Sequence, residues 1–178
     1  MTKQIWTVGH SNRTSDELIE LLRVEAIELL ADVRRFPGSR LHPQFNRDAL
    51  RSALAEQRIA YRHFESLGGR RRRKKGPSPN RAWRVESFNA YADHMASSEF
   101  QQGLVQLEQH AEQKRTAIMC SEALPWRCHR RLIADALIAR GWEVFDIFSP
   151  TQTKPHHLTE FARVENGSVT YPEATLFD

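Results

Sequence analysis

Residues 116–137 read TAIMCSEALPWRCHRRLIADAL, and this stretch decides the fold because three kinds of structure follow one another in it. The apolar run at 116–119 has the composition of a buried strand, and RRLIADALIAR at 130–140 has the spacing of an amphipathic helix. A short polar loop joins them and carries both cysteines of the chain, Cys120 and Cys128. A strand, a loop and a helix in this order indicate one unit of an alternating α/β fold.

The same alternation extends outward from this stretch. Strands are predicted at 5–8, 27–33, 59–64, 116–119 and 144–148. One helix is predicted after Thr14, which forms a capping box with Glu17, and a second after the cap Asn46. Further helices are predicted at 85–96, 99–113, 130–140 (ended by Gly141) and, shortest, 156–164. We therefore predict a single α/β domain over residues 1–178, with a mostly parallel central sheet of about five strands flanked by helices.

Composition narrows the class of protein. Of the 178 residues, 40% are hydrophobic and 27% charged, as in ordinary globular proteins. No apolar run approaches the roughly 20 residues that cross a bilayer, and the N-terminus has no signal-peptide pattern, so we expect no membrane partner. Two cysteines are too few for a disulfide scaffold, which favours a cytoplasmic protein. We expect no cofactor.

The net charge of +4 comes from one segment in a loop predicted at about 65–80. The segment consists of Arg70, Arg71, Arg72, Arg73, Lys74 and Lys75. Without it, the basic residues fall from 26 to slightly fewer than the 22 acidic residues. Such a run can contact nucleic-acid phosphates, or it can be a solvated loop whose like charges repel one another.

Polar residues follow three of the predicted strands. They are His10, Ser11 and Asn12 after the first strand; Asp32, Arg34, Arg35, Pro37 and Ser39 at the end of the second; and Cys120, Ser121, Glu122, Cys128, His129 and Arg130 after the fourth. Ligands of open parallel sheets bind outside the carboxyl ends of the strands. We therefore expect these residues to face one crevice, with the proline-containing loop 36–45 arching over it.

The two cysteines suggest nucleophilic chemistry. Cys128 precedes a predicted helix, where backbone N–H groups and the helix dipole favour anions, and His129 and Arg130 follow it. This position predicts a lowered thiol pKa and a raised nucleophilicity. Cys120 ends a buried strand, so a catalytic role and a small hydrophobic role are equally compatible with it. No zinc site is predicted, because the cysteines and His129 match no common ligand spacing.

The remaining candidates have two interpretations each. Glu122 can act as a general acid or base, or it can form a structural salt bridge. His10 can move protons or be a hydrogen-bonded structural residue, and Asp32 can hold His10 or orient Arg34. The predicted catalytic set is thus Glu122, Cys120, Cys128 and His10. The predicted substrate-binding set is Ser11, Asn12, Asp32, Arg34, Pro37, Ser39, His129 and Arg130, in which the arginines form a guanidinium clamp for an anion.

The motifs TVGHSNR (7–13), LLADVRRFPGSR (29–40), IAYRHFESLGGR (59–70) and MCSEALPWRCHRRLIADAL (119–137) resemble those of the "domain of unknown function 488" family. The resemblance extends over nearly the whole chain. It implies a compact α/β domain with these polar segments gathered together. It implies no reaction.

A weaker likeness links the chain to rhodanese-type sulfurtransferases and related phosphatases, which also have a DVR motif after one strand and a catalytic cysteine after another. The chain departs from them, because Trp126 stands where the phosphatase pattern has arginine and the loop contains no glycine. We predict an enzyme of unassigned reaction that acts on an anionic substrate: a nucleotide, a nucleobase-containing compound or a nucleic acid. The alternatives are a thiol sulfurtransferase and a non-catalytic nucleic-acid-binding module.

Overall fold

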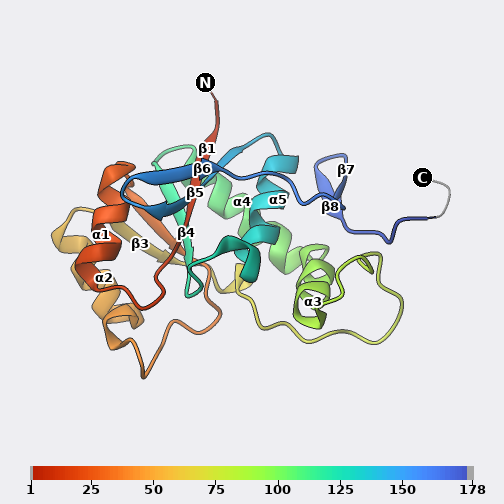
Figure 1. Cartoon of the computed structure of the whole chain (residues 1–178), viewed down its shortest axis with the longest axis horizontal. Coiled ribbons are helices and arrows are strands. Elements are labelled where there is room, and N and C mark those ends of the chain that lie inside the picture. Colours follow the sequence, from red (N-terminus) through yellow and green to blue (C-terminus); the bar gives the residue numbers. More distant parts are fainter. Residues whose placement is uncertain (1, 176–178) are drawn as a thin grey trace.

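The structure, a computed structural model, describes residues 2–175 (Figure 1). Its elements in chain order are β1 (Gln4–Gly9), α1 (Ser15–Val24), β2 (Leu29–Asp32), η1 (Pro43–Phe45), α2 (Arg47–Glu56), β3 (Ala60–His63), η2 (Glu65–Leu67), α3 (Glu86–Met95), α4 (Ser98–Ala111), β4 (Thr116–Cys120), η3 (Pro125–Arg127), α5 (Arg130–Ala139), β5 (Glu143–Ser149), β6 (Gln152–Pro155), β7 (Arg163–Glu165) and β8 (Ser168–Thr170). The η elements are single turns of 3₁₀ helix.

A six-stranded sheet forms the centre of the molecule, in the order β3-β2-β4-β1-β5-β6. Strands β1 to β5 pair in parallel, and β6 runs antiparallel to β5. The predicted fold class is confirmed. The sheet has one strand more than expected because the chain turns back directly after β5 and adds an edge strand. Strands β7 and β8 form a separate hairpin.

Helices cover both faces of the sheet (Figure 1). On one face, Leu18 of α1 and Leu54 of α2 pack in a core cluster with Val8 of β1. On the other face, residues of α3, α4 and α5 share a second cluster with Ile5 of β1 and Ile118 of β4. Each fully buried aliphatic side chain of this kind contributes about 2 kcal/mol of hydrophobic stabilisation. Strand alternation thus gives every central strand two apolar faces and leaves its carboxyl end for polar residues.

Local signals in the sequence set several helix ends. The capping box is confirmed: the Thr14 hydroxyl accepts from the Glu17 backbone N–H at 3.1 Å, and the Glu17 carboxylate accepts from the Thr14 N–H at 2.8 Å. Asn46 precedes α2 as predicted, but its side chain does not cap the helix, because it accepts from the Ser39 N–H at 2.6 Å and braces the loop before η1. Gly141 ends α5 with a φ of 87°.

The prediction of a short helix at 156–164 is wrong. The backbone N–H of His156 donates to the Val144 carbonyl at 2.7 Å, and that of Thr159 donates to the Asp135 carboxylate at 3.0 Å. These bonds tie the start of the segment to β5 and α5 in an irregular conformation, and its last two residues belong to β7. Tertiary contacts of this kind routinely override helix propensity.

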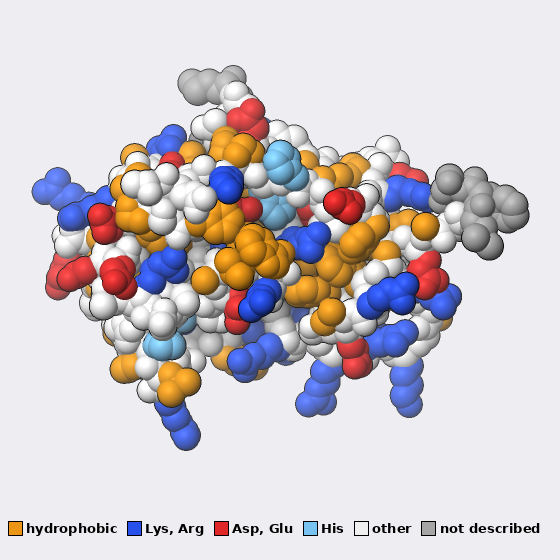
Figure 2. All heavy atoms as spheres, viewed as in Figure 1, with side chains coloured by type: hydrophobic (Ala, Val, Ile, Leu, Met, Phe, Trp, Pro, Cys, Tyr) orange, Lys and Arg blue, Asp and Glu red, His pale blue; other side chains and the backbone are white. Residues whose placement is uncertain are grey.

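The loop before α3 carries the basic segment. Residues 68–85 form neither helix nor strand, and Ser78 and Asn80 anchor the loop by donating to the Asp93 carboxylate of α3 at 2.6 and 2.8 Å. Lys and Arg side chains project downward at the lower right of Figure 2, where this loop runs in Figure 1. In the stretch from 2 to 175, no helix has the length and apolarity needed to cross a membrane.

Candidate functional site

The carboxyl ends of β1, β2 and β4 meet at one pocket. Their register places Gly9 beside Cys120 and Asp32 beside Met119. The pocket has a volume of about 460 Å³, which is in the range of small-molecule sites. Within residues 2–175, no group of three or more His, Cys, Asp or Glu side chains is arranged to hold a metal ion.

The pocket brings together about half of the predicted site residues. His10, Arg34, Ser39, Arg70, Cys120, Glu122, Cys128 and His129 line it. The lining, taken over the described residues, does not include Ser11, Asn12, Asp32, Pro37, Arg130 or the basic residues from Arg71 to Lys75. Asp32 and Arg130 nevertheless contact lining residues from behind. Asp32 and Arg130 therefore act on the pocket through the residues that they hold and not by contact with a ligand.

Several lining residues were not singled out from the sequence. They are His42, Gly69, Ser87, Phe88, Tyr91 and Arg127. Ser87, Phe88 and Tyr91 belong to α3, and no pattern in the preceding loop indicates where that helix packs. Arg127 and His42 lay within reach of sequence reasoning, because Arg127 adjoins Cys128 and His42 lies in the loop expected to arch over the crevice.

Gly9 allows the loop after β4 to pack against the end of β1. A Cβ atom at position 9 would lie 1.8 Å from the Glu122 carbonyl oxygen, so only glycine fits there. The backbone N–H groups of His10 and Ser11 donate to the carbonyls of Cys120 and Ser121, both at 2.9 Å. The pairing of β1 with β4 thus continues past the strands and fixes the loop that carries Glu122.

Cys128 and His129 form a potential nucleophile and base pair. The Cys128 Sγ lies 3.4 Å from His129 Nδ1, and the backbone N–H of Arg130 donates to the same sulfur at 3.4 Å. His129 Nε2 lies 2.7 Å from the Val33 carbonyl, so we assign the proton to Nε2 and leave Nδ1 unprotonated toward the thiol. Burial lowers the pKa of the His129 ring and favours its neutral form. A nucleophile beside a base that a third group orients is the usual arrangement of cysteine-dependent enzymes.

The two thiols differ in acidity. Burial raises the pKa of the Cys128 thiol, but the hydrogen bond from Cys120, the charge of Arg130 and the hydrogen bonds from Arg130 outweigh it and lower the pKa to about 7. Burial raises the pKa of the Cys120 thiol well above its usual value. Cys128 is therefore the more acidic thiol of the pair, while Cys120 stays a neutral thiol that donates to the Glu122 carbonyl at 3.8 Å.

Arg130 lies behind the cysteines and is 1% exposed. Its Nε donates to Cys120 Sγ at 3.0 Å, one Nη donates to the Glu122 carbonyl at 2.6 Å, and the other donates to the Thr7 hydroxyl at 3.0 Å. None of these partners is a carboxylate. Because a buried cation requires compensation, negative charge on the two cysteine sulfurs is favoured beside it. The geometry places Arg130 as a partner of the sulfur atoms and not as part of the expected substrate clamp.

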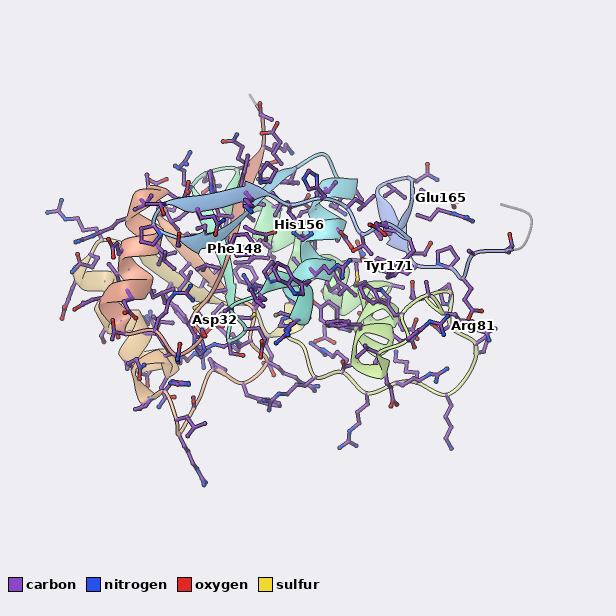
Figure 3. All side chains as sticks on the ribbon, in the orientation of Figure 1. Asp32, Arg81, Phe148, His156, Glu165 and Tyr171 are labelled. Atoms are coloured by element: carbon purple, nitrogen blue, oxygen red, sulfur yellow. The ribbon has the colours of Figure 1, made fainter. Side chains whose placement is uncertain are left out.

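Asp32 orients Arg34, the second of its two predicted roles. Its carboxylate accepts from Arg34 Nη2 at 2.7 Å and Nε at 2.9 Å, and from the Tyr61 hydroxyl at 2.6 Å. Arg34 Nη1 in turn lies 3.4 Å from His10 Nε2. Figure 3 shows Asp32 toward the lower end of the sheet in this view. The bound guanidinium thus forms a fixed wall of the pocket.

His10 is held in its neutral form. Its Nδ1 lies 2.8 Å from the Ser11 carbonyl, and its ring stacks on Phe45 with the centroids 4.3 Å apart. Burial lowers the pKa of His10 to about 4, so the ring is uncharged at neutral pH. These properties suit a fixed hydrogen-bond acceptor better than a proton donor.

Several positive groups gather at the pocket. Arg35, Arg70 and Arg127 line it, and the Arg35 guanidinium is held by a bond to the Arg70 carbonyl at 2.9 Å. Helices α3 and α5 both begin at the pocket without a side-chain cap, so the N–H groups of their first turns and their dipoles favour negative charge. Glu122 adds an exposed carboxyl group to the same lining.

The family model described as "Domain of unknown function DUF488" matches residues 14–137. The chain belongs to the DUF488 family. The matched part contains Asp32, Arg34, both cysteines and Arg130, whereas His10 lies outside it. No curated protein and no solved structure matches the chain. Because the DUF488 description names no reaction, any functional conclusion has to come from the geometry of the site.

Proposed function

We propose that this DUF488 protein is an enzyme in which Cys128 attacks an anionic substrate. The observation that carries the proposal is the position of the Cys128 sulfur in the pocket, 3.4 Å from His129 Nδ1 and 3.4 Å from the Arg130 backbone nitrogen. His129 accepts the thiol proton, and the thiolate forms a bond to an electrophilic centre of the substrate. The leaving group departs with its bonding electron pair and takes the proton that His129 accepted. Water then displaces the substrate fragment from the sulfur, which regenerates the Cys128 thiolate.

The substrate class follows from the charge and shape of the pocket. Arg35, Arg70 and Arg127 offer a phosphate or carboxylate charge-assisted hydrogen bonds, while Phe36 and Phe88 offer aromatic surface to a planar ring. A pocket of about 460 Å³ accommodates a nucleotide or an extruded nucleobase. We therefore propose a nucleotide, a nucleobase-containing compound or a nucleic-acid end as substrate. Two free thiols fit a reducing cytoplasm.

An Arg127→Gln variant is expected to weaken binding of a nucleoside monophosphate. A charge-assisted hydrogen bond to a phosphate contributes about 1.5–3 kcal/mol, which corresponds to a loss of tenfold or more in affinity. Isothermal titration calorimetry measures the change. Arg51→Gln is the matched control, because Arg51 is an exposed arginine on α2 outside the pocket lining. Equal affinities for the two variants, or wild-type protein that binds neither the nucleotide nor inorganic phosphate, would contradict the proposal.

A sulfurtransferase activity is the second candidate, and the lowered pKa of Cys128 beside a second thiol favours it. In such a reaction the Cys128 thiolate attacks the outer sulfur of thiosulfate, forms a sulfur–sulfur bond and releases sulfite with the electron pair of the broken bond. The product is a Cys128 persulfide, which Arg130 can stabilise as an anion. An acceptor thiolate then takes the outer sulfur and regenerates Cys128.

Nucleic-acid binding by the basic segment is the third candidate, either alone or as an addition to catalysis. Arg70 lines the pocket, and Arg72, Arg73, Lys74 and Lys75 follow it on the surface. Arg71 is engaged within the fold, since its guanidinium donates to the carbonyls of Gly68 at 2.9 Å and Glu65 at 3.0 Å. The segment therefore extends a positive charge from the pocket rim along the loop.

Replacing Arg72, Arg73, Lys74 and Lys75 with glutamine is expected to weaken binding of a single-stranded oligonucleotide. Binding of a mononucleotide in the pocket should be unchanged. Each lost phosphate contact reduces the slope of log K against log salt by about 0.7. Fluorescence anisotropy at several salt concentrations measures both quantities. An unchanged slope would show that the segment does not contact phosphates.

A further inference from the structure

A buried polar array leads away from the pocket behind Arg130. The Thr7 hydroxyl accepts from Arg130 Nη1 at 3.0 Å and donates to Asp146 Oδ1 at 2.7 Å. The second oxygen of Asp146 lies 2.7 Å from His156 Nδ1. Thr7 belongs to β1, Asp146 to β5, and His156 follows β6, so three distant segments of the chain build the array. None of the three residues lines the pocket, and none can therefore touch a substrate there.

His156 lies between two carboxylates. Its side chain is 7% exposed, and its Nε2 lies 3.7 Å from Asp135 Oδ1 on α5. The same Asp135 accepts from the Tyr171 hydroxyl at 2.8 Å. Figure 3 shows His156 near the centre of the molecule and Tyr171 toward the β7–β8 hairpin. Burial lowers the pKa of His156, but the two carboxylates beside it, Asp135 at 3.7 Å and Asp146 through a hydrogen bond, outweigh it and raise the pKa to about 9. His156 is therefore a cation at neutral pH.

The positive charge of His156 affects the electrostatic potential at Arg130 and the two cysteines. Asp146 is one hydroxyl group away from Arg130, which is buried and bonds to no carboxylate directly. An uncompensated Asp146 would oppose the positive potential that stabilises the Cys128 thiolate. His156 offsets part of the negative charge of Asp146 and so leaves more of the charge of Arg130 to the sulfur atoms. The Thr7 hydroxyl meanwhile holds the guanidinium in the orientation in which its Nε reaches Cys120.

We propose that Thr7, Asp146 and His156 are positioning residues that hold the Arg130 guanidinium against the two cysteines and reserve its charge for the Cys128 sulfur. The inference rests on the proposed role of Cys128 as the nucleophile. It adds residues on the far side of Arg130 from the pocket, namely Asp146 on β5 and His156 after β6, to those that influence Cys128. The titratable groups that face His156 are Asp135, Asp146 and, through Asp135, Tyr171. Those that face Cys128 are Cys120, His129, Arg130 and, from α3, Tyr91.

The test measures the pH at which Cys128 becomes reactive. Full-length protein is alkylated with iodoacetamide across neutral and alkaline pH, and peptide mapping assigns the label, since trypsin cleaves at Arg127 between the two cysteines. In Thr7→Val the hydroxyl is lost at nearly constant volume, and in His156→Gln the cation is lost. In both variants, the pH at which Cys128 alkylation reaches half of its maximal rate is expected to rise by about one unit. This shift of the midpoint corresponds to ~1.4 kcal/mol. Thr7→Ser, which keeps the hydroxyl, is expected to restore the wild-type midpoint.

Thr153→Val provides a matched control. The Thr153 hydroxyl donates to the Glu25 carboxylate at the edge of the sheet, outside the pocket and the array. Its removal is expected to lower thermal stability without moving the midpoint. If Thr7→Val and His156→Gln also lower only the stability, the three residues are structural and the inference is overturned. Should Thr7→Val fail to fold, His156→Gln decides alone. A wild-type midpoint at the ordinary thiol value of ~8.5 would instead overturn the proposed role of Cys128.

Discussion

An Arg130→Met variant is expected to lose most of the reactivity of Cys128 at neutral pH. Arg130 contributes both its charge and its hydrogen bonds to the pKa of about 7 for the Cys128 thiol, and without them burial remains as an opposing effect. The pKa then rises at least to the free-thiol value of ~8.5, and the thiolate fraction at pH 7 falls from about half to a few per cent. The alkylation rate at pH 7 should fall by roughly tenfold or more, while the rate at alkaline pH recovers. A pH–rate profile with iodoacetamide measures the shift.

The neighbouring residue on α5 supplies the control for this variant. Arg131 donates to the Thr159 hydroxyl at 2.9 Å and lies over the Trp83 ring, 5.2 Å from its centroid, away from both sulfur atoms. Arg131→Met is expected to reduce stability without changing the pH–rate profile. Arg130→Met also leaves the Thr7 hydroxyl and the Glu122 carbonyl without their donor, at a cost of about 1–3 kcal/mol each, so both variants need thermal denaturation curves. An unchanged profile in Arg130→Met would show that another group activates the thiol.

The convergence of the polar segments could be predicted because it depends only on strand direction. Parallel strands end at the same edge, so residues that directly follow β1, β2 and β4 must meet, whatever their side chains do. The register of Gly9 with Cys120 meets this expectation. The capping box at Thr14 was equally predictable, because it depends on two residues three positions apart.

The role of Arg130 could not be predicted, because the sequence does not say which way a long side chain points. Arg130 follows His129 in the same loop-to-helix junction, yet its guanidinium turns inward to Cys120 and Thr7 while His129 faces the pocket. The array behind it was hidden for a related reason. Thr7 and Asp146 are 139 positions apart, and His156 lies in a segment whose pattern suggested a helix.

The position of α3 escaped prediction because the loop before it has no periodicity. Residues 68–85 turn at places set by tertiary bonds, such as those from Ser78 and Asn80 to Asp93. Ser87 and Phe88 reach the pocket only as a result of these turns. The sequence therefore predicts the part of the site that lies at the strand ends. It does not predict the side of the pocket that α3 forms.

A Cys128→Ser variant is expected to abolish covalent labelling at neutral pH, whereas Cys120→Ala should retain it. A serine hydroxyl does not ionise near neutral pH, and the high pKa of the Cys120 thiol keeps that residue unreactive. In Cys120→Ala the hydrogen bond that helps to lower the pKa of Cys128 is lost, so the labelling midpoint should rise while the labelled site stays the same. Peptide mapping of alkylated protein distinguishes the two variants in one experiment.

The same pair of variants separates the candidate reactions when the protein is incubated with thiosulfate or with a nucleotide. A sulfurtransferase gains the mass of one sulfur atom at Cys128, and Cys128→Ser gains none. An enzyme that attacks a nucleotide gives no such adduct with thiosulfate but loses turnover in Cys128→Ser with nucleotide binding preserved, because the arginines of the pocket remain in place. Labelling of Cys120 in preference to Cys128 in the wild-type protein would make Cys120 the nucleophile. It would also remove the role given to His129, whose Nδ1 lies 3.4 Å from the Cys128 sulfur.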